Sequence, residues 1–226
     1  MRVARESLRQ KRARAEAIME RLDDEMPEAT IELDHTSPLE LLVAVILSAQ
    51  CTDKRVNMVT PALFRDFPDA RAYANATPEQ LEDYLKTLGL FRAKAKNLAK
   101  LGKDLLEHHD GAVPLTRAEL AELPGVGQKT AGVVSMHLGG ERAFPVDTHV
   151  GRLARRMGLT RELAPDKVEA DLRDLLPSEL WMQGHQLLVW HGRRTCFARA
   201  PECERCVVAD LCPKVGVTGA GKRVRA

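Results

Sequence analysis

The hydrophobic positions of this chain recur almost everywhere at helical spacing. A first segment places its apolar residues three or four positions apart, at Ala15, Ile18, Met19 and Leu22. This spacing is the period of one helix face. A second segment, residues 39–49, is apolar on nearly every face, which is typical of a helix buried at the centre of a domain. Convincing strand-like alternation is absent from the sequence, so the pattern predicts an all-α fold.

The polar residues between these segments mark where helices begin. A Ser or Thr followed three residues later by Glu or Gln occurs at Ser37, Thr77 and Thr116. This pair can satisfy the free N–H groups of a first helical turn, and we predict a capping box at each. At the first two, proline occupies the first helical position, where its missing N–H is not needed. Later helices are predicted over residues 93–109, 128–138, 148–157, 166–175 and 180–191.

Residues 123–130 read Leu-Pro-Gly-Val-Gly-Gln-Lys-Thr and connect two predicted helices. Gly125 and Gly127 leave backbone amides open to a ligand that a side chain would block. The N-terminus of the following helix adds unpaired N–H groups and a partial positive charge. We therefore interpret the stretch as a helix–hairpin–helix whose turn binds an anion, most naturally a phosphate.

Lys129, in the first turn of that following helix, has two interpretations. It can be a plain phosphate contact, or it can be a nucleophile, because the positive end of a helix favours the neutral amine that Schiff-base chemistry needs. Asp147 follows one helix later and could return to the same site, or simply cap the helix that begins at Thr148. A Walker-type nucleotide loop is excluded, since it requires glycine where Gln128 stands.

Four of the five cysteines cluster near the C-terminus with the spacing C-x6-C-x2-C-x5-C; they are Cys196, Cys203, Cys206 and Cys212. In a chain without a secretion signal, such clustering favours a metal site over disulfides. Four thiolates suit either tetrahedral zinc or a [4Fe–4S] cluster, and the spacing alone leaves both open. Cys51 stands apart, and we expect it to be a small buried hydrophobic residue.

The charge of the chain changes this picture only through its distribution. A net charge of +2 over 226 residues is too small to indicate a nucleic-acid partner by itself. Basic residues crowd the last third, at Arg152, Arg155, Arg156, Arg161, Arg193, Arg194, Arg199, Lys214, Lys222, Arg223 and Arg225. This concentration predicts either a phosphate-binding surface or a merely solvated basic face.

The sequence shows no targeting or membrane signal. No apolar core of a signal peptide follows the basic N-terminus, and no segment approaches the roughly 20 apolar residues of a membrane span. We therefore expect a cytoplasmic protein in a reducing compartment.

Together these features resemble the endonuclease III family of helix–hairpin–helix DNA glycosylases. The similarity covers nearly the whole chain and follows the family's order: Ser37-Pro38, Ser48-Ala49-Gln50, residues 123–130, residues 146–149 and residues 191–212. It implies two helical domains flanking a DNA-binding cleft. One is a continuous six-helix domain, residues 31–141, containing the hairpin. The other combines residues 1–30 with 142–226, and its four clustered cysteines hold a [4Fe–4S] cluster.

The resemblance also implies an activity, that of a base-excision-repair DNA N-glycosylase and AP lyase. Such an enzyme removes oxidised pyrimidines, such as thymine glycol, from double-stranded DNA. Lys129 would attack C1′ of the sugar and form a Schiff base, Asp147 would receive or orient its proton, and β-elimination would cut 3′ to the abasic site. We expect a monomer of bacterial type associated with the nucleoid.

Further residues match the family's DNA contacts. Gln50 matches the residue that fills the space left by a flipped base, and Leu90 the apolar wedge in the other strand. Unstacking a base costs a few kcal/mol, so residues that occupy the void have a clear energetic purpose. Gly125 and Gly127 match the amides that hold a phosphate near the lesion, a contact that positions the enzyme without reading sequence. Arg193 is expected to contact DNA as well.

The chain departs from the family pattern where basic residues are usual. The loop between Cys196 and Cys203 carries one arginine and one glutamate, and Gln128 precedes the lysine; Arg193 and Arg194 could compensate. Two alternatives remain open from the sequence: a monofunctional glycosylase of the same superfamily, or a non-catalytic, metal-stabilised DNA-binding or redox-sensing module.

Overall fold

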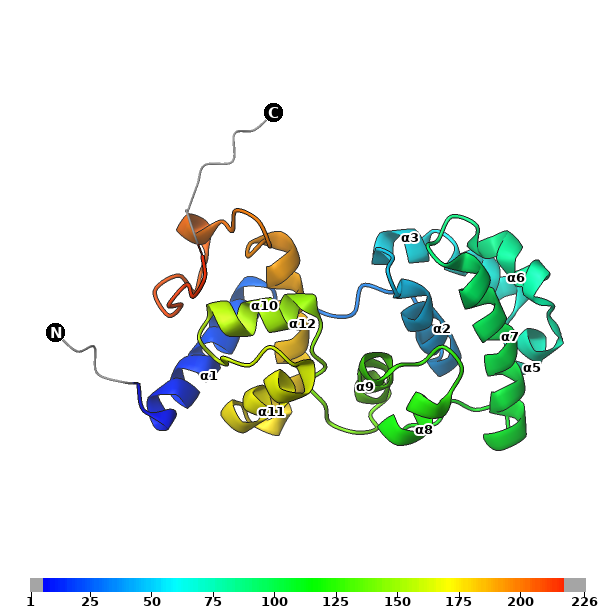
Figure 1. Ribbon diagram of the computed structural model, residues 1–226, viewed down its shortest axis with the longest axis horizontal. Coiled ribbons are helices and arrows are strands. Elements are labelled where there is room, and N and C mark those ends of the chain that lie inside the picture. Colours follow the sequence, from blue (N-terminus) through cyan, green and yellow to red (C-terminus); the bar gives the residue numbers. More distant parts are fainter. Residues whose placement is uncertain (1–5, 218–226) are drawn as a thin grey trace, which may run out of the picture. The chain divides into compact units, whose positions relative to one another are not determined.

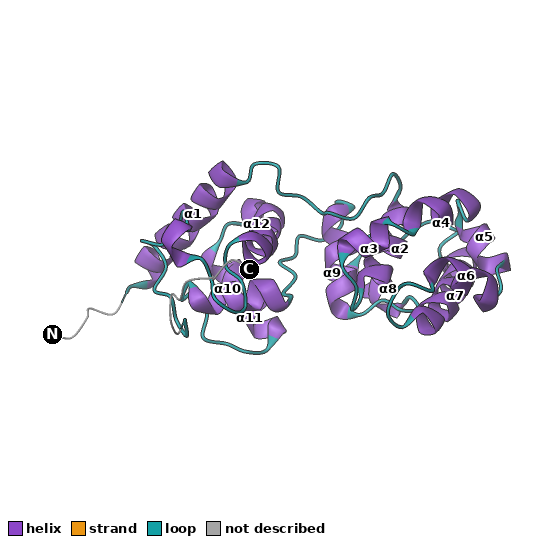
Figure 2. Cartoon of the chain, turned by 90° about the horizontal axis from the view of Figure 1, so that it is seen from above, coloured by secondary structure: helices purple, strands orange, loops and turns teal. Residues whose placement is uncertain are grey.

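The computed structural model describes residues 6–217, and every helix or strand assigned in that range is a helix. Figure 2 shows these helices joined by loops, with no strand in the described part of the chain. The all-α prediction is confirmed. The basic residues Lys222, Arg223 and Arg225 of the tail lie outside the described range.

The chain forms two compact units, Glu32–Ala143 and the combination of Met1–Ile31 with Phe144–Ala226. The first unit contains α2 (Pro38–Ser48), α3 (Asp53–Asn57), α4 (Thr60–Asp66), α5 (Ala70–Asn75), α6 (Pro78–Leu85), α7 (Phe91–His108), α8 (Arg117–Glu122) and α9 (Gln128–His137). The second contains α1 (Leu8–Glu25), α10 (Thr148–Arg156), α11 (Pro165–Leu175), α12 (Trp181–Arg194) and two short 3₁₀ turns (Figure 1).

The core of the first unit is built on α2. Its residues from Leu41 to Leu47 are all buried, which confirms the central helix expected from its uniform apolar character. The helix packs against α7 and α9. Because α9 carries Lys129 and α7 begins beside Leu90, this packing places the candidate residues of the unit on one framework.

The helix starts are where the sequence predicts them, but two of the three predicted capping boxes are incomplete. Thr77 forms the reciprocal capping box with Gln80. Ser37 accepts from the N–H of Glu40, but the Glu40 carboxylate turns to the N–H and hydroxyl of Thr36. The capping box predicted at Ser37 is therefore only half formed, because Thr36 offers the carboxylate two donors at once.

Thr116 caps α8 through the N–H of Glu119, and its own hydroxyl donates to the Glu119 carboxylate at 2.6 Å. That capping box is also incomplete. The helical periodicity did not predict α3 and α5, since five or six residues span fewer than two turns. Each nevertheless has an N-cap side chain, Thr52 for α3 and Asp69 for α5.

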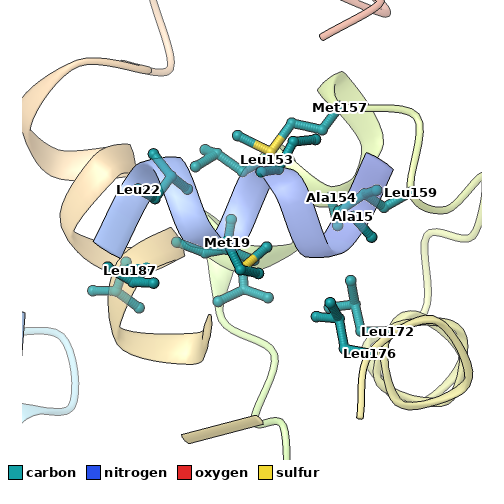
Figure 3. Packing of buried hydrophobic residues seen from close by; sticks show 14 of the residues in the cluster. Ala15, Met19, Leu22, Leu153, Ala154, Met157, Leu159, Leu172, Leu176 and Leu187 are labelled. Carbon is teal, nitrogen blue, oxygen red and sulfur yellow. The ribbon is translucent and has the colours of Figure 1, made fainter. Parts of the chain in front are cut away.

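The second unit is held together by a core that joins the N-terminal helix to the C-terminal part of the chain. Figure 3 shows Met19 and Leu22 of α1 packed among Leu153, Leu172 and Leu187 from later helices. All five side chains are almost inaccessible to solvent. This packing orients α10, which Asp147 caps at its N-terminus, and α12, which carries Arg193 in its last turn.

At Gly102, the backbones of α5 and α7 approach each other closely. A Cβ atom there would lie 2.4 Å from the backbone nitrogen of Ala74 and 2.7 Å from the carbonyl oxygen of Ala70. We predict that Gly102→Ala lowers the free energy of unfolding by about 1–3 kcal/mol, since overpacked backbone must shift. An ordinary helical Gly→Ala change is stabilising by about 1 kcal/mol.

Denaturant unfolding measures this effect, with Lys103→Ala, an exposed position on the same helix, as the control. A Gly102→Ala protein as stable as the control variant would contradict the close approach of the two helices.

Candidate functional site

The hairpin between α8 and α9 is closed by a hydrogen bond from the N–H of Val126 to the carbonyl of Leu123, 3.1 Å long. Its two glycines have different structural roles. Gly125 has a φ of +82°, and a Cβ there would lie 2.9 Å from the Asn97 amide nitrogen. Gly127 is the N-cap of α9 with a φ of −92°, and a Cβ there would meet nothing within 4 Å. Gly125 is therefore required by the turn, whereas Gly127 leaves open space over the helix N-terminus.

Lys129 lies in the first turn of α9, directly beside that open space. Its side chain is exposed, and no hydrogen bond or ion pair joins it to another residue of the unit 32–143. The helix has no side-chain cap, so its first-turn N–H groups are not covered by a neighbouring side chain. The result is an uncommitted amine next to an uncapped positive helix end.

Gln50 and Leu90 lie on two turns, one after α2 and one before α7. Both adopt left-handed backbone, with φ of 56° and 58°, which is uncommon outside glycine. Both are exposed, Leu90 to 57%. The N–H of Gly89 donates to the sulfur of Cys51 at 3.2 Å, which joins the turns through the residues next to these two.

Cys51 is not the buried hydrophobic residue that its isolation in the sequence predicted. It is half-buried, and its sulfur accepts from the Gly89 N–H and from the Lys94 ammonium, each at 3.2 Å. Lys94 is 5% exposed and was missed by the sequence reasoning. It occupies a position on the apolar face of α7, four residues before Leu98 and seven before Leu101, and that placement was the available signal.

Asp147 caps α10, and its carboxylate accepts from the N–H of Val150 at 2.8 Å. The capping interpretation of this residue is therefore confirmed, and the carboxylate is half-buried. The nearby imidazole of His149 has its pKa lowered by burial, against the opposing effect of the Asp147 charge. His149 therefore favours the neutral form at neutral pH.

Arg152 and Arg156 do not form the phosphate-binding surface that their concentration suggested. Arg152 donates to the carbonyls of Gly192 and Cys196 at 2.9 and 3.1 Å. Arg156 donates to the carbonyl of Phe197 at 2.6 Å. Both guanidinium groups are thus used within the fold, where they hold the chain after α12.

The two arginines at the end of α12 differ from each other. Arg194 stacks on the ring of Trp190, with 3.7 Å from the guanidinium carbon to the ring centre, and pairs with Glu28. Arg193 is exposed on the same helix end. Both residues named as compensating charges are exposed, and Arg194 in addition makes the stacking contact with Trp190 and the ion pair with Glu28.

The four clustered cysteines line one small pocket; they are Cys196, Cys203, Cys206 and Cys212. All four are free and half-buried. Arg156 lies 3.4 Å from the Cys196 sulfur, and His191 lies 3.4 Å from the Cys206 sulfur. In the described part of the chain, no three His, Cys, Asp or Glu side chains converge closely enough to hold one metal ion. Sulfurs that surround a space, rather than meet at a point, fit a multi-iron cluster better than a single zinc ion.

Burial raises the pKa of the Cys206 and Cys212 thiols. It also lowers the pKa of His191 to about 4, with the charge of Arg205 acting in the same direction. The site therefore presents thiols beside a neutral imidazole, and iron binding would displace the thiol protons.

None of the described helices is long and apolar enough to cross a membrane.

Two family models match the chain. Residues 43–178 match the HhH-GPD superfamily of base excision DNA repair proteins. Residues 196–212, which begin and end at clustered cysteines, match the iron–sulfur binding domain of endonuclease III. The first match covers both the hairpin and Asp147.

Curated relatives and solved structures give the same assignment. Endonuclease III of Synechocystis is 47% identical over 90% of this chain and 93% of its own length. Endonuclease III of Escherichia coli K12 is 42% identical over 86% of this chain and 92% of its own. A trapped endonuclease III–DNA covalent intermediate has a TM-score of 0.85 and 39% identity, covering 90% of this chain and 96% of that one. A non-covalent endonuclease III–DNA complex has the same TM-score and identity.

These matches establish the activity class and the cofactor. The protein is a DNA-binding enzyme of base excision repair, a DNA glycosylase with AP lyase activity, and it carries a [4Fe–4S] cluster. The alternative of a non-catalytic binding module is thereby set aside. By the identity and coverage of its relatives, by both family models and by its all-helical fold, the chain belongs to the endonuclease III family of the HhH-GPD superfamily.

Proposed function

We propose that this enzyme removes oxidised pyrimidines of the thymine-glycol type from duplex DNA and cuts 3′ to the resulting abasic site, with Lys129 as the nucleophile. One observation carries the proposal. Lys129 is an exposed amine without a partner in its unit, beside the open space over Gly127 at the start of α9. A phosphate bound at the hairpin would hold the sugar of the same strand near this amine.

The chemistry follows from a neutral amine and a carboxylate. The Lys129 nitrogen attacks C1′ of the damaged nucleotide, the bond from C1′ to the base breaks, and the base leaves with the electron pair. We assign Asp147 to receive or orient the proton that the amine loses. Opening of the sugar ring gives an imine, which makes the 2′ proton acidic. Loss of that proton breaks the C3′–O bond and cuts the strand.

The hairpin is assigned the phosphate contact. The amides of Gly125 and Gly127 and the uncapped N-terminus of α9 attract an anion without a charged side chain. Contacts of this kind fix position without reading sequence, as an enzyme that searches for damage requires. Arg193 supplies a charged DNA contact from the end of α12.

Gln50 and Leu90 are assigned to the duplex that a flipped nucleotide leaves behind. Flipping a base costs a few kcal/mol of stacking, and side chains that occupy the gap recover part of that cost. The polar amide of Gln50 suits the space beside an unpaired base, and the exposed Leu90 suits a wedge between bases. Their left-handed backbone presents both side chains at turns rather than on helix faces.

Cys196, Cys203, Cys206 and Cys212 are assigned as the ligands of the [4Fe–4S] cluster. Bound there, the cluster would link the segment that follows α12. Arg156 also holds this segment by donating to the carbonyls of Phe197 and Ala198. We propose that the enzyme acts as a monomer. The bacterial origin of the relatives supports a place on the DNA of the nucleoid.

Replacing the proposed nucleophile tests the core of the mechanism. We predict that Lys129→Ala abolishes the covalent adduct that borohydride traps between enzyme and thymine-glycol duplex, because no other amine attacks C1′. Gel electrophoresis of the trapped adduct is the measurement. Lys100→Ala, an exposed lysine of α7, should trap as wild type does.

Equal trapping by Lys129→Ala and wild type would show that the nucleophile is another residue. Base release by the wild type with neither strand cleavage nor trapping would instead indicate a monofunctional glycosylase.

Asp147→Asn separates the charge of this residue from its capping role. Asn caps helices about as well as Asp, so we expect a change of less than about 1 kcal/mol in the free energy of unfolding. We expect base release in a single turnover to slow by at least about 100-fold, since general acid–base groups contribute about that much or more. The same change at Asp69, which caps α5 through the N–H of Ala72, should leave the rate unaltered. A normal rate of base release in Asp147→Asn would show that Asp147 only caps α10 and has no role in the chemistry.

Gly127→Ala tests the phosphate contact without breaking the hairpin. Its Cβ meets no protein atom but would occupy the space proposed for the phosphate, so we expect about tenfold weaker DNA binding. A hydrogen bond to a charged group contributes about 1.5–3 kcal/mol, consistent with that loss. The dependence of log K on log salt should be unchanged, because backbone amides release no counterions.

Arg193→Ala is the charged counterpart, and it should reduce that salt slope by about 0.9, the value for one neutralised phosphate. Fluorescence anisotropy over a salt series measures both variants. If Gly127→Ala binds DNA with wild-type affinity, the hairpin does not bind a DNA phosphate as proposed.

A further inference from the structure

Lys94 is a buried charged residue that the proposed mechanism does not use. It extends from the first turn of α7 and is 5% exposed. Its ammonium donates to the carbonyls of Leu47 and Ala49, at 2.9 and 2.8 Å, and to the sulfur of Cys51 at 3.2 Å. An ammonium has three N–H donors, and all three have an acceptor here.

These acceptors lie at the C-terminal end of α2 and in the turn that follows it. The last carbonyls of a helix lack partners within the helix and carry partial negative charge. Lys94 supplies hydrogen-bond donors to these carbonyls and a positive charge that offsets their partial negative charge. Removing it would leave buried carbonyls unsatisfied, an arrangement that folded proteins avoid.

The same contacts reach both turns assigned to the DNA duplex. Gln50 lies between Ala49 and Cys51, two of the three residues that accept from Lys94. Leu90 follows Gly89, whose N–H donates to the Cys51 sulfur, and a Cβ at Gly89 would lie 3.5 Å from the Gln50 carbonyl. Leu90 itself lies one helical turn before Lys94, whose N–H donates to the Leu90 carbonyl at 3.0 Å.

Both turns hold a non-glycine residue in left-handed backbone. Each such residue costs of order 1–3 kcal/mol, and the conformation persists only where surrounding contacts impose it. The contacts around Gln50 and Leu90 converge on the Lys94 ammonium and the sulfur that it binds. Strained backbone at two exposed side chains, tied to one buried cation, is the pattern of a positioned site.

We propose that Lys94 is a positioning residue that holds Gln50 and Leu90 at the spacing needed to occupy a duplex opened by base flipping. The inference rests on the proposed function, because it takes the roles of Gln50 and Leu90 from it. It predicts a selective defect. Steps that require an opened duplex depend on Lys94, and the chemistry of Lys129 on an already accessible sugar does not.

Lys94→Met keeps the length of the side chain and removes its charge and donors. We expect single-turnover base release from a thymine-glycol duplex to slow by about tenfold or more, as misplacement of about 1 Å can cost up to 100-fold. Borohydride trapping on a single-stranded oligonucleotide with an abasic site should stay within about twofold of wild type, because no stacked duplex has to be filled. Lys100→Met, on the exposed face of α7, is the matched control and should change neither.

A second comparison shows whether Lys94 acts through the wedge. If it positions Leu90, adding Leu90→Ala to Lys94→Met should slow duplex base release by less than Leu90→Ala does in the wild type. Fully additive effects, or equal losses on duplex and single strand, would overturn the proposal. Where Lys94→Met does not fold, Lys94→Gln replaces it, because its shorter side chain has only two donors for the three acceptors. A wild-type ratio of duplex to single-strand rates in that variant would overturn the proposal as well. Absence of any trapped adduct with the wild type would instead refute the proposed function.

Discussion

A buried helix that ends inside a protein must have its last carbonyl groups satisfied, and much of the site in the first unit depends on how this chain meets that requirement at α2. The helix is buried from Leu41 to Leu47, so the Leu47 carbonyl near its C-terminal end needs a partner within the protein. Lys94 satisfies the carbonyls of Leu47 and Ala49. Because the lysine belongs to α7, the end of one helix and the beginning of another become a single hydrogen-bonded structure.

The opposite end of a second helix supplies the other half of the chemistry. At α9 the positive N-terminus is left without a side-chain cap, next to a glycine whose missing side chain leaves open space. The negative end of α2 is therefore satisfied by the protein itself, and the positive end of α9 remains available to an anion. Both helices pack against each other within the unit 32–143. One unit thus combines a helix end that the protein itself satisfies with a helix end that is open to an anion.

The sequence was sufficient to predict the helical class, the main helix starts, the hairpin and the cysteine cluster, because each depends on local spacing. Thr77 and Gln80 are three residues apart, so they can form a capping box at the start of any helix that begins there. The four clustered cysteines are close in sequence and are therefore also close in space. It was not sufficient for interactions that join distant segments. Lys94 and Cys51 are far apart in sequence, and nothing local indicates that a lysine on an apolar face meets a cysteine after another helix.

The same limit explains the arginines. Counting basic residues near the C-terminus suggested a phosphate surface, yet Arg152 and Arg156 bind backbone carbonyls of their own unit. A count of charges cannot distinguish a side chain that faces solvent from one that organises a loop. Hydrogen-bonding partners make that distinction, and they depend on the tertiary fold.

This use of arginine bears on how the enzyme can search DNA. Arg152 and Arg156 are committed to the fold and Arg194 stacks on Trp190, so part of the basic cluster near the C-terminus is used within the fold. The net charge of the chain is only +2. The DNA contacts proposed for the hairpin amides and for Leu90 rely on geometry, and geometry differs between damaged and intact duplex where phosphate charge does not. If binding depends on these contacts more than on charge, undamaged DNA is held more weakly, and the proposed selectivity rests on how firmly the turns at Gln50 and Leu90 are held.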